Sequence, residues 1–138
     1  MNNYKGQIET IQKREIEYSK IFEAEPKTET ELKDMLSKFD EYKGFQKKKN
    51  KAFVDLIIFF REINSKYKKD KSVDEQIDRL EKIFNVSYKR SVDTIDAYKE
   101  YLITNNKKYL TYIQQEAEKQ KLIKDEINKL SVDIYKSL

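Results

Sequence analysis

The sequence predicts an all-α protein, and three observations carry this prediction. Glycine occurs twice and proline once in 138 residues, which is too few for the many turns of a sandwich, a barrel or an α/β domain. Apolar residues recur every three to four positions over long segments, which is the period of a helix. Two chain breaks carry the residues of a helix N-terminus. We therefore expect one helical domain over residues 1–138.

The first expected break is a hinge near residues 24–27, at Pro26. Proline disfavours a helical conformation at the residue before it. Thr28 and Glu31 follow with the spacing of a capping box, in which each side chain bonds a free backbone N–H group at the helix start. These signals end a first helix over about residues 3–23 and begin a second over about residues 28–68. Polar residues interrupt the apolar repeat of these two helices at Glu15, Gln46 and Lys49.

The second expected break is a turn near residues 69–71. Ser72 and Glu75 repeat the capping-box spacing and begin a third helix over about residues 72–137. The pair Asn105-Asn106 is the one candidate break inside this helix. A helix beginning there would carry lysines in its first turn, where the helix dipole disfavours cations. We therefore expect the third helix to be continuous.

The helix lengths indicate the architecture. Folding the chain at residues 69–71 places residue i opposite about residue 140 − i, so that Leu56 faces Phe84 and Phe60 faces Leu80. This pairing favours a long antiparallel helical hairpin that forms a bundle or coiled coil, alone or as a dimer. The alternative is a sharp corner at Pro26, which gives a compact bundle of three or four helices.

Residues 52–60 read AFVDLIIFF and contain a single polar residue. On a helical wheel their apolar arc covers roughly 260°, whereas a surface helix has an apolar stripe a little over 100° wide. One facing helix cannot cover this arc. Either the core of a compact bundle buries it, or an interface with a helical partner or a second copy of the chain does so. The candidate partner-binding residues are Phe53, Val54, Leu56, Ile57, Ile58, Phe59, Phe60, Ile63, Ile77, Leu80 and Phe84.

The composition excludes most catalytic chemistry. Histidine and cysteine are absent, which rules out zinc sites, haem ligation, disulfides and Ser-His or Cys-His nucleophiles. Acidic pairs such as Asp93 and Asp96 arise by chance in a chain this rich in charge. We expect no catalytic, cofactor-binding or metal-binding residue and no small-molecule substrate. The expected function is a non-catalytic protein–protein interaction or adaptor role through helical faces.

A basic block is the second candidate site. Residues 43–71 carry 10 basic and 3 acidic side chains. Lys47, Lys48, Lys49 and Lys51 could contact an anion or a nucleic acid, which leaves open a phage or mobile-element protein that binds a host protein or nucleic acid. At 100° per residue these lysines spread around the helix, which is typical of a solvated surface.

No apolar run approaches the roughly 18 residues of a membrane span, and the first residues lack an apolar signal core. We therefore expect a cytoplasmic protein, with export alongside a partner left open. The abundance of lysine, asparagine, isoleucine and tyrosine is typical of a low-GC bacterium or its phages.

In size and form, the expected cysteine-free helical hairpin resembles the small cytosolic helical-hairpin partners of Gram-positive type VII secretion. Tyr112 and Glu116 match the loose Tyr-x-x-x-acid export signal. The Trp-x-Gly turn of the best-known members is missing, and the turn here reads Lys-Lys-Asp-Lys-Ser. The resemblance implies an alternative function as a chaperone-like adaptor of a secreted effector.

Overall fold

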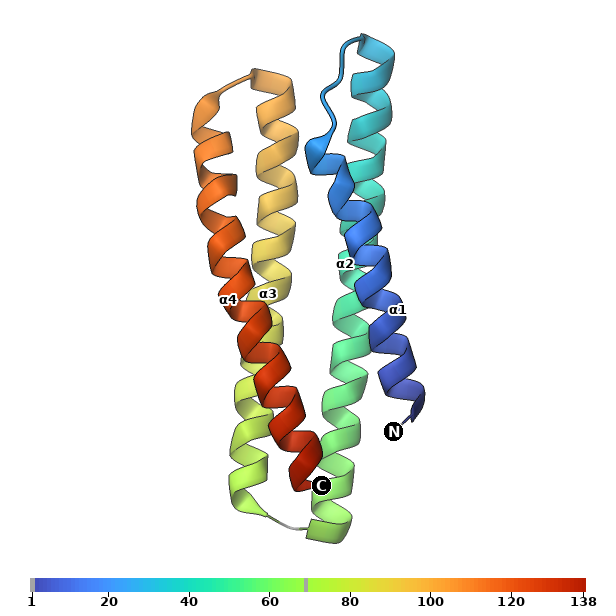
Figure 1. Cartoon of the computed structure of the whole chain (residues 1–138), viewed down its shortest axis with the longest axis vertical. Coiled ribbons are helices and arrows are strands. Elements are labelled where there is room, and N and C mark those ends of the chain that lie inside the picture. Colours follow the sequence, from blue (N-terminus) through green and yellow to red (C-terminus); the bar gives the residue numbers. More distant parts are fainter. Residues whose placement is uncertain (1, 69) are drawn as a thin grey trace.

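The computed structural model is an all-α bundle, as the composition predicts (Figure 1). It describes residues 2–68 and 70–138, with side chains from residue 6 onward. Four long helices pack antiparallel within these residues: α1 Asn2–Ser19, α2 Glu29–Ile63, α3 Lys71–Thr104 and α4 Lys107–Ser137. A short 3-10 helix, η1 Lys20–Glu23, extends α1, and a π-helical turn, η2 Asn64–Lys68, extends α2.

The break at Pro26 is a corner. The chain reverses between η1 and α2, so α1 lies antiparallel along α2 (Figure 1). Of the two architectures that the sequence allowed, the compact bundle is therefore the one that forms. The predicted cap at Thr28 is confirmed: Thr28 Oγ1 accepts a hydrogen bond from the Glu31 N–H at 3.1 Å. Glu31 Oε2 accepts one from the Lys27 N–H at 2.6 Å, one residue before the N–H that a capping box uses.

The turn between α2 and α3 falls in the predicted region, although residue 69 lies outside the described residues. The cap sits two residues before the predicted Ser72: Asp70 Oδ1 accepts the Ser72 N–H at 2.9 Å. The buried Asn64 holds the turn together. Its Oδ1 accepts the Asp70 N–H at 3.2 Å, and its Nδ2 donates to Asp70 O at 2.9 Å and to Asp74 Oδ1 at 2.7 Å.

The expectation of one continuous helix over residues 72–137 is wrong, because the chain breaks at Asn105-Asn106. Asn105 adopts the left-handed conformation with φ 54°, and its N–H donates to Tyr101 O at 2.8 Å. Asparagine accepts this conformation more readily than other side chains do. Asn106 then caps α4, since its Oδ1 accepts the Lys108 N–H at 3.1 Å. A helix stop followed at once by an N-cap outweighs the dipole cost of two lysines.

The predicted pairing of the second and third helices agrees with the side-chain contacts between α2 and α3. The Phe53 and Phe84 rings stack with centroids 4.2 Å apart. Three ion pairs follow the same register, between Lys43 and Asp96 at 2.8 Å, Lys99 and Asp40 at 2.6 Å, and Arg61 and Asp78 at 2.8 Å.

Two apolar clusters lie along the bundle. The turn cluster is next to the α2–α3 turn, and its buried residues come from α2, α3 and α4: Leu56, Ile57, Phe60, Val73, Ile77, Leu80, Phe84, Leu130 and Ile134. The aromatic cluster occupies the other half, and its buried residues come from α2 and α3 alone: Met35, Phe39, Tyr42, Phe45, Ile95 and Tyr98. None of the described helices is long and apolar enough to cross a membrane.

Candidate functional site

An open groove runs along the bundle on the side where α1 and α4 approach one another. Helix α4 packs extensively on α3, and α1 packs on α2, but α1 and α4 make few contacts among the described residues. The groove has a volume of about 540 Å³. Side chains from all four long helices line it, and most of its lining surface is apolar. The apolar lining includes Ile11, Ile16, Phe22, Phe53, Ala117 and Ile127.

The shape of the groove suits an elongated occupant. On α4 its lining runs from Ile113 to Asn128, a distance of about 22 Å at 1.5 Å per residue. It remains open to solvent along this length. Ala117, one helical turn from Ile113 at one end of this lining, presents only a methyl group, so an approaching backbone can come close there. Such a groove accommodates a row of apolar side chains better than a single enclosed molecule.

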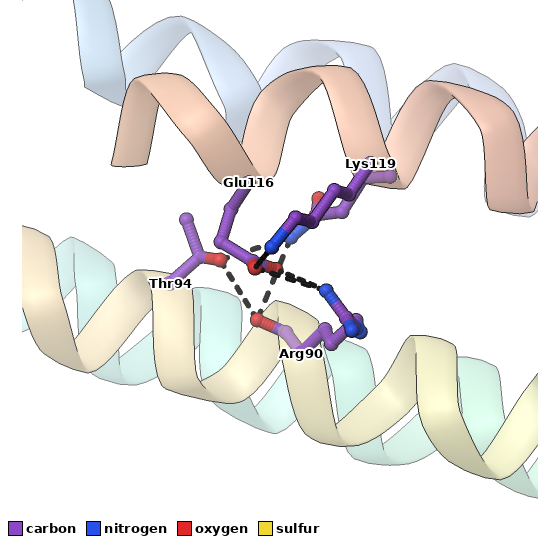
Figure 2. Close-up of polar contacts among 5 residues, drawn as sticks. Arg90, Thr94, Glu116 and Lys119 are labelled. Carbon is purple, nitrogen blue, oxygen red and sulfur yellow. Dashed lines mark hydrogen bonds and ion pairs between the residues drawn. The ribbon is translucent and has the colours of Figure 1, made fainter. Parts of the chain in front are cut away.

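An ion pair with a buried carboxylate fixes the wall formed by α3 and α4. Figure 2 shows Glu116 of α4 pointing toward Arg90 of α3. The Glu116 side chain is 5% exposed, and its two carboxylate oxygens accept from Arg90 Nη1 at 2.9 and 3.1 Å. Lys119 Nζ lies 3.9 Å from the same carboxylate. Sliding α4 along α3 would leave this carboxylate buried without its main cation, so the pair favours one register.

A second polar contact lies beside this pair on the wall of the groove. Gln120 Nε2 donates to Thr94 Oγ1 at 2.9 Å, and Thr94 Oγ1 donates to Arg90 O at 2.8 Å. Both side chains line the groove. Their hydrogen bonds are made within the chain, so they hold this wall in a fixed shape.

The tyrosines near the groove stay protonated at neutral pH. Burial raises the pKa of Tyr42, and the nearby Glu15 carboxylate raises it further. Burial also raises the pKa of Tyr112, helped by Glu116 and Asp93. Neither phenol is therefore poised as a base.

The wall formed by α1 and α2 contains the residues that interrupt the apolar repeats. Glu15 of α1 accepts from Lys49 Nζ at 2.5 Å and from Gln46 Nε2 at 3.4 Å. Lys49 Nζ also lies 5.8 Å from the centre of the Phe53 ring. These contacts form a polar layer between the two apolar clusters, and the groove opens at this level.

The structure places the predicted partner-binding residues mainly inside the chain. The innermost belong to the turn cluster: Leu56, Ile57, Phe60, Ile77, Leu80 and Phe84. Phe53 and Phe59 pack against that cluster, and Ile63 is half-buried. Most of the apolar arc of residues 52–60 is therefore covered within the bundle, which is one of the two alternatives that the sequence left open. Val54 and Ile58 are 42% and 50% exposed, and neither lines the groove.

The lysine run divides between two sides of α2. Lys47, Lys48 and Lys51 are exposed, whereas Lys49 turns toward Glu15 and lines the groove. Lys47, Lys48 and Lys51 span only about 100° of the helix, so Lys49 alone faces away from the other three. The sequence interpretation missed the cationic edge of the groove at Lys121 and Lys124, because that edge exists only once α4 folds back along α3.

Within the part of the chain that the structure describes, no three carboxylates are grouped so that they could hold a metal ion. Comparison of the chain with protein-family models, with curated proteins and with solved structures gives no match.

Proposed function

We propose that this protein is a non-catalytic interaction module that binds one amphipathic helix of a partner protein in the groove between α1 and α4. The observation that carries the proposal is an open, mainly apolar groove to which all four long helices contribute. A protein that binds a helix presents an apolar groove of this kind, and the bound helix inserts side chains at i, i+3, i+4 and i+7 spacing.

The geometry supports a helix as the occupant for two reasons. The groove extends over about four turns of α4, which matches a short helical segment in length. Its walls are held by the Glu116–Arg90 pair on one side and by the Glu15–Lys49 pair on the other. Walls fixed in this way reduce the ordering cost of binding, because the site need not rearrange around the ligand.

Two tryptophan variants test the proposal. Ala117→Trp places a large ring inside the groove, whereas Gln115→Trp places the same ring on an exposed part of α4 that does not line it. The probe is a fluorescent helical peptide with leucines at i, i+3, i+4 and i+7 and glutamine elsewhere. A peptide of the same composition in scrambled order serves as the control.

We expect the amphipathic peptide to bind the wild-type protein and the Gln115→Trp variant equally, as measured by fluorescence anisotropy. Ala117→Trp should weaken binding about tenfold or more, because overfilling a packed site costs about 1–3 kcal/mol. Equal binding to both variants, or no binding beyond that of the scrambled peptide, would overturn the proposal.

A further inference from the structure

The two edges of the groove differ in charge. On the α1 edge, the carboxylate of Glu15 is paired with Lys49, and the neighbouring Gln12 and Ser19 are neutral. On the α4 edge lie Lys121 and Lys124, both exposed and three residues apart. One edge is therefore neutral and the other is cationic.

The two α4 lysines differ from their neighbour Lys119. The Lys119 ammonium group lies 3.9 Å from Glu116. No salt bridge within 4.0 Å involves Lys121 or Lys124 among the described residues. Residues three apart on a helix lie on the same face, so the two ammonium groups stand together beside the groove. A helix docked in the groove would lie next to both of them.

We propose that the partner helix carries aspartate or glutamate residues along the edge that lies against α4. This inference rests on the proposed function and adds the chemical class of the partner. Carboxylates three or four residues apart would meet Lys121 and Lys124 at the rim of the interface. Complementary charge at a rim raises the rate of association and selects the partner and its orientation. A helix with lysine or arginine at that edge would be repelled.

Three peptides with the same leucine face test this inference. They carry glutamate, glutamine or lysine at the positions flanking the leucines on one edge. Each is titrated against the wild-type protein, against Lys121→Glu/Lys124→Glu, and against the matched control Lys129→Glu/Lys136→Glu. The control makes the same change in net charge at exposed positions of α4 outside the groove.

We expect the wild-type protein to bind the glutamate peptide about tenfold more tightly than the lysine peptide at low salt. The preference should shrink as the salt concentration rises. It should invert in Lys121→Glu/Lys124→Glu and persist in the control.

The outcomes separate the two proposals. If all three peptides bind equally and Ala117→Trp weakens each of them, the charge inference is wrong and the groove remains the binding site. If the glutamate preference survives in Lys121→Glu/Lys124→Glu, other charges cause it and the inference is also wrong. If no peptide binds, the proposed function itself fails.

Discussion

The turn cluster and the aromatic cluster both contain buried residues of α2 and α3. They differ in the kind of side chain that they contain and in the helices that cover them. The turn cluster is mostly aliphatic, and α4 contributes Leu130 and Ile134 to its buried interior. The aromatic cluster draws its buried residues from α2 and α3 alone, and partly buried residues of α1 and η1 cover it. Among these, the Tyr18 ring lies 5.4 Å from the Tyr42 ring, and Phe22 lies 5.1 Å from Tyr98.

This difference shows how the bundle comes to have a groove. The C-terminal part of α4 contributes buried residues to the turn cluster, whereas α1 and η1 supply most of the partly buried residues that cover the aromatic cluster. In the middle, Glu15 of α1 lies beside the buried Gln46, but α1 and α4 make few contacts with one another. The groove thus lies between the part of the core that α4 covers and the part that α1 and η1 cover.

The largest effect is expected in the turn cluster. Leu80 is 0% exposed, so Leu80→Ala should lower the free energy of unfolding by about 2–5 kcal/mol through lost burial and the remaining cavity. The matched change Ile21→Ala, in the partly buried cover of the aromatic cluster, should cost less, about 1 kcal/mol. Urea unfolding followed by circular dichroism measures both. Equal losses would mean that the two halves are closed equally well.

The ion pair between Arg90 of α3 and Glu116 of α4 is expected to respond differently to the loss of each partner. Arg90→Met leaves the Glu116 carboxylate buried with only Lys119 nearby, and should cost up to about 3 kcal/mol. Glu116→Gln keeps the side-chain volume and one hydrogen-bond acceptor, and should cost about 1 kcal/mol. Thermal and urea unfolding of the two variants provide the measurement. A larger loss in Glu116→Gln would contradict the role of Arg90 as compensating cation.

Alkaline pH should lower the free energy of unfolding through the buried tyrosines of the aromatic cluster. Burial raises the pKa of Tyr42 and of Tyr98 above the ordinary value of 10.0. Above this pH the unfolded chain loses these protons before the folded chain does, so the free energy of unfolding falls as the pH rises. Each such phenol contributes up to about 1.4 kcal/mol per pH unit. Urea unfolding of wild-type protein and of Tyr42→Phe between about pH 8 and pH 11 measures the slope, which should be shallower in the variant.

The smallest effect is expected at Val54 and Ile58, the exposed large apolar residues of α2. Ile58 is 50% exposed, so Ile58→Ser should change the free energy of unfolding by about 0.5 kcal/mol or less. The melting temperature at several protein concentrations and the mass by light scattering provide the measurement. A loss that grows with protein concentration would show that Val54 and Ile58 form an interface between chains, outside both clusters.

Local signals predicted the central pair of helices. The apolar repeats and the Thr28 cap were sufficient for α2 and for its pairing with α3, because heptad spacing and capping chemistry act over a few residues. The break at Asn105 was missed because the dipole cost of lysines was weighed above the left-handed preference of asparagine. That single error hid the reversal of α4 and therefore the groove.

Only part of the candidate site could be predicted from the sequence. Glu15, Gln46 and Lys49 stood out as polar interruptions in two separate repeats, and the structure shows that they contact one another. Ala117 and Lys121 carried no comparable signal, because an alanine and a lysine on a charged helix are ordinary. Their significance depends on which helix lies opposite, and that is decided by the corners at Pro26 and at Asn105-Asn106.

The hydrogen bond from Tyr98 Oη to Phe22 O, 3.0 Å long, joins residues 76 positions apart. Bringing such distant positions together restricts a long loop of unfolded chain, whereas the α2–α3 turn closes a short one. The corner at Pro26 also closes a short loop, since Glu15 and Gln46 are 31 positions apart. We therefore expect the α1–α2 and α2–α3 pairs to form before the contact between Tyr98 and Phe22. Until that contact forms, the rings of Phe22 and Tyr98, which lie 5.1 Å apart in the bundle, remain partly exposed, and apolar surface left open in this way favours aggregation.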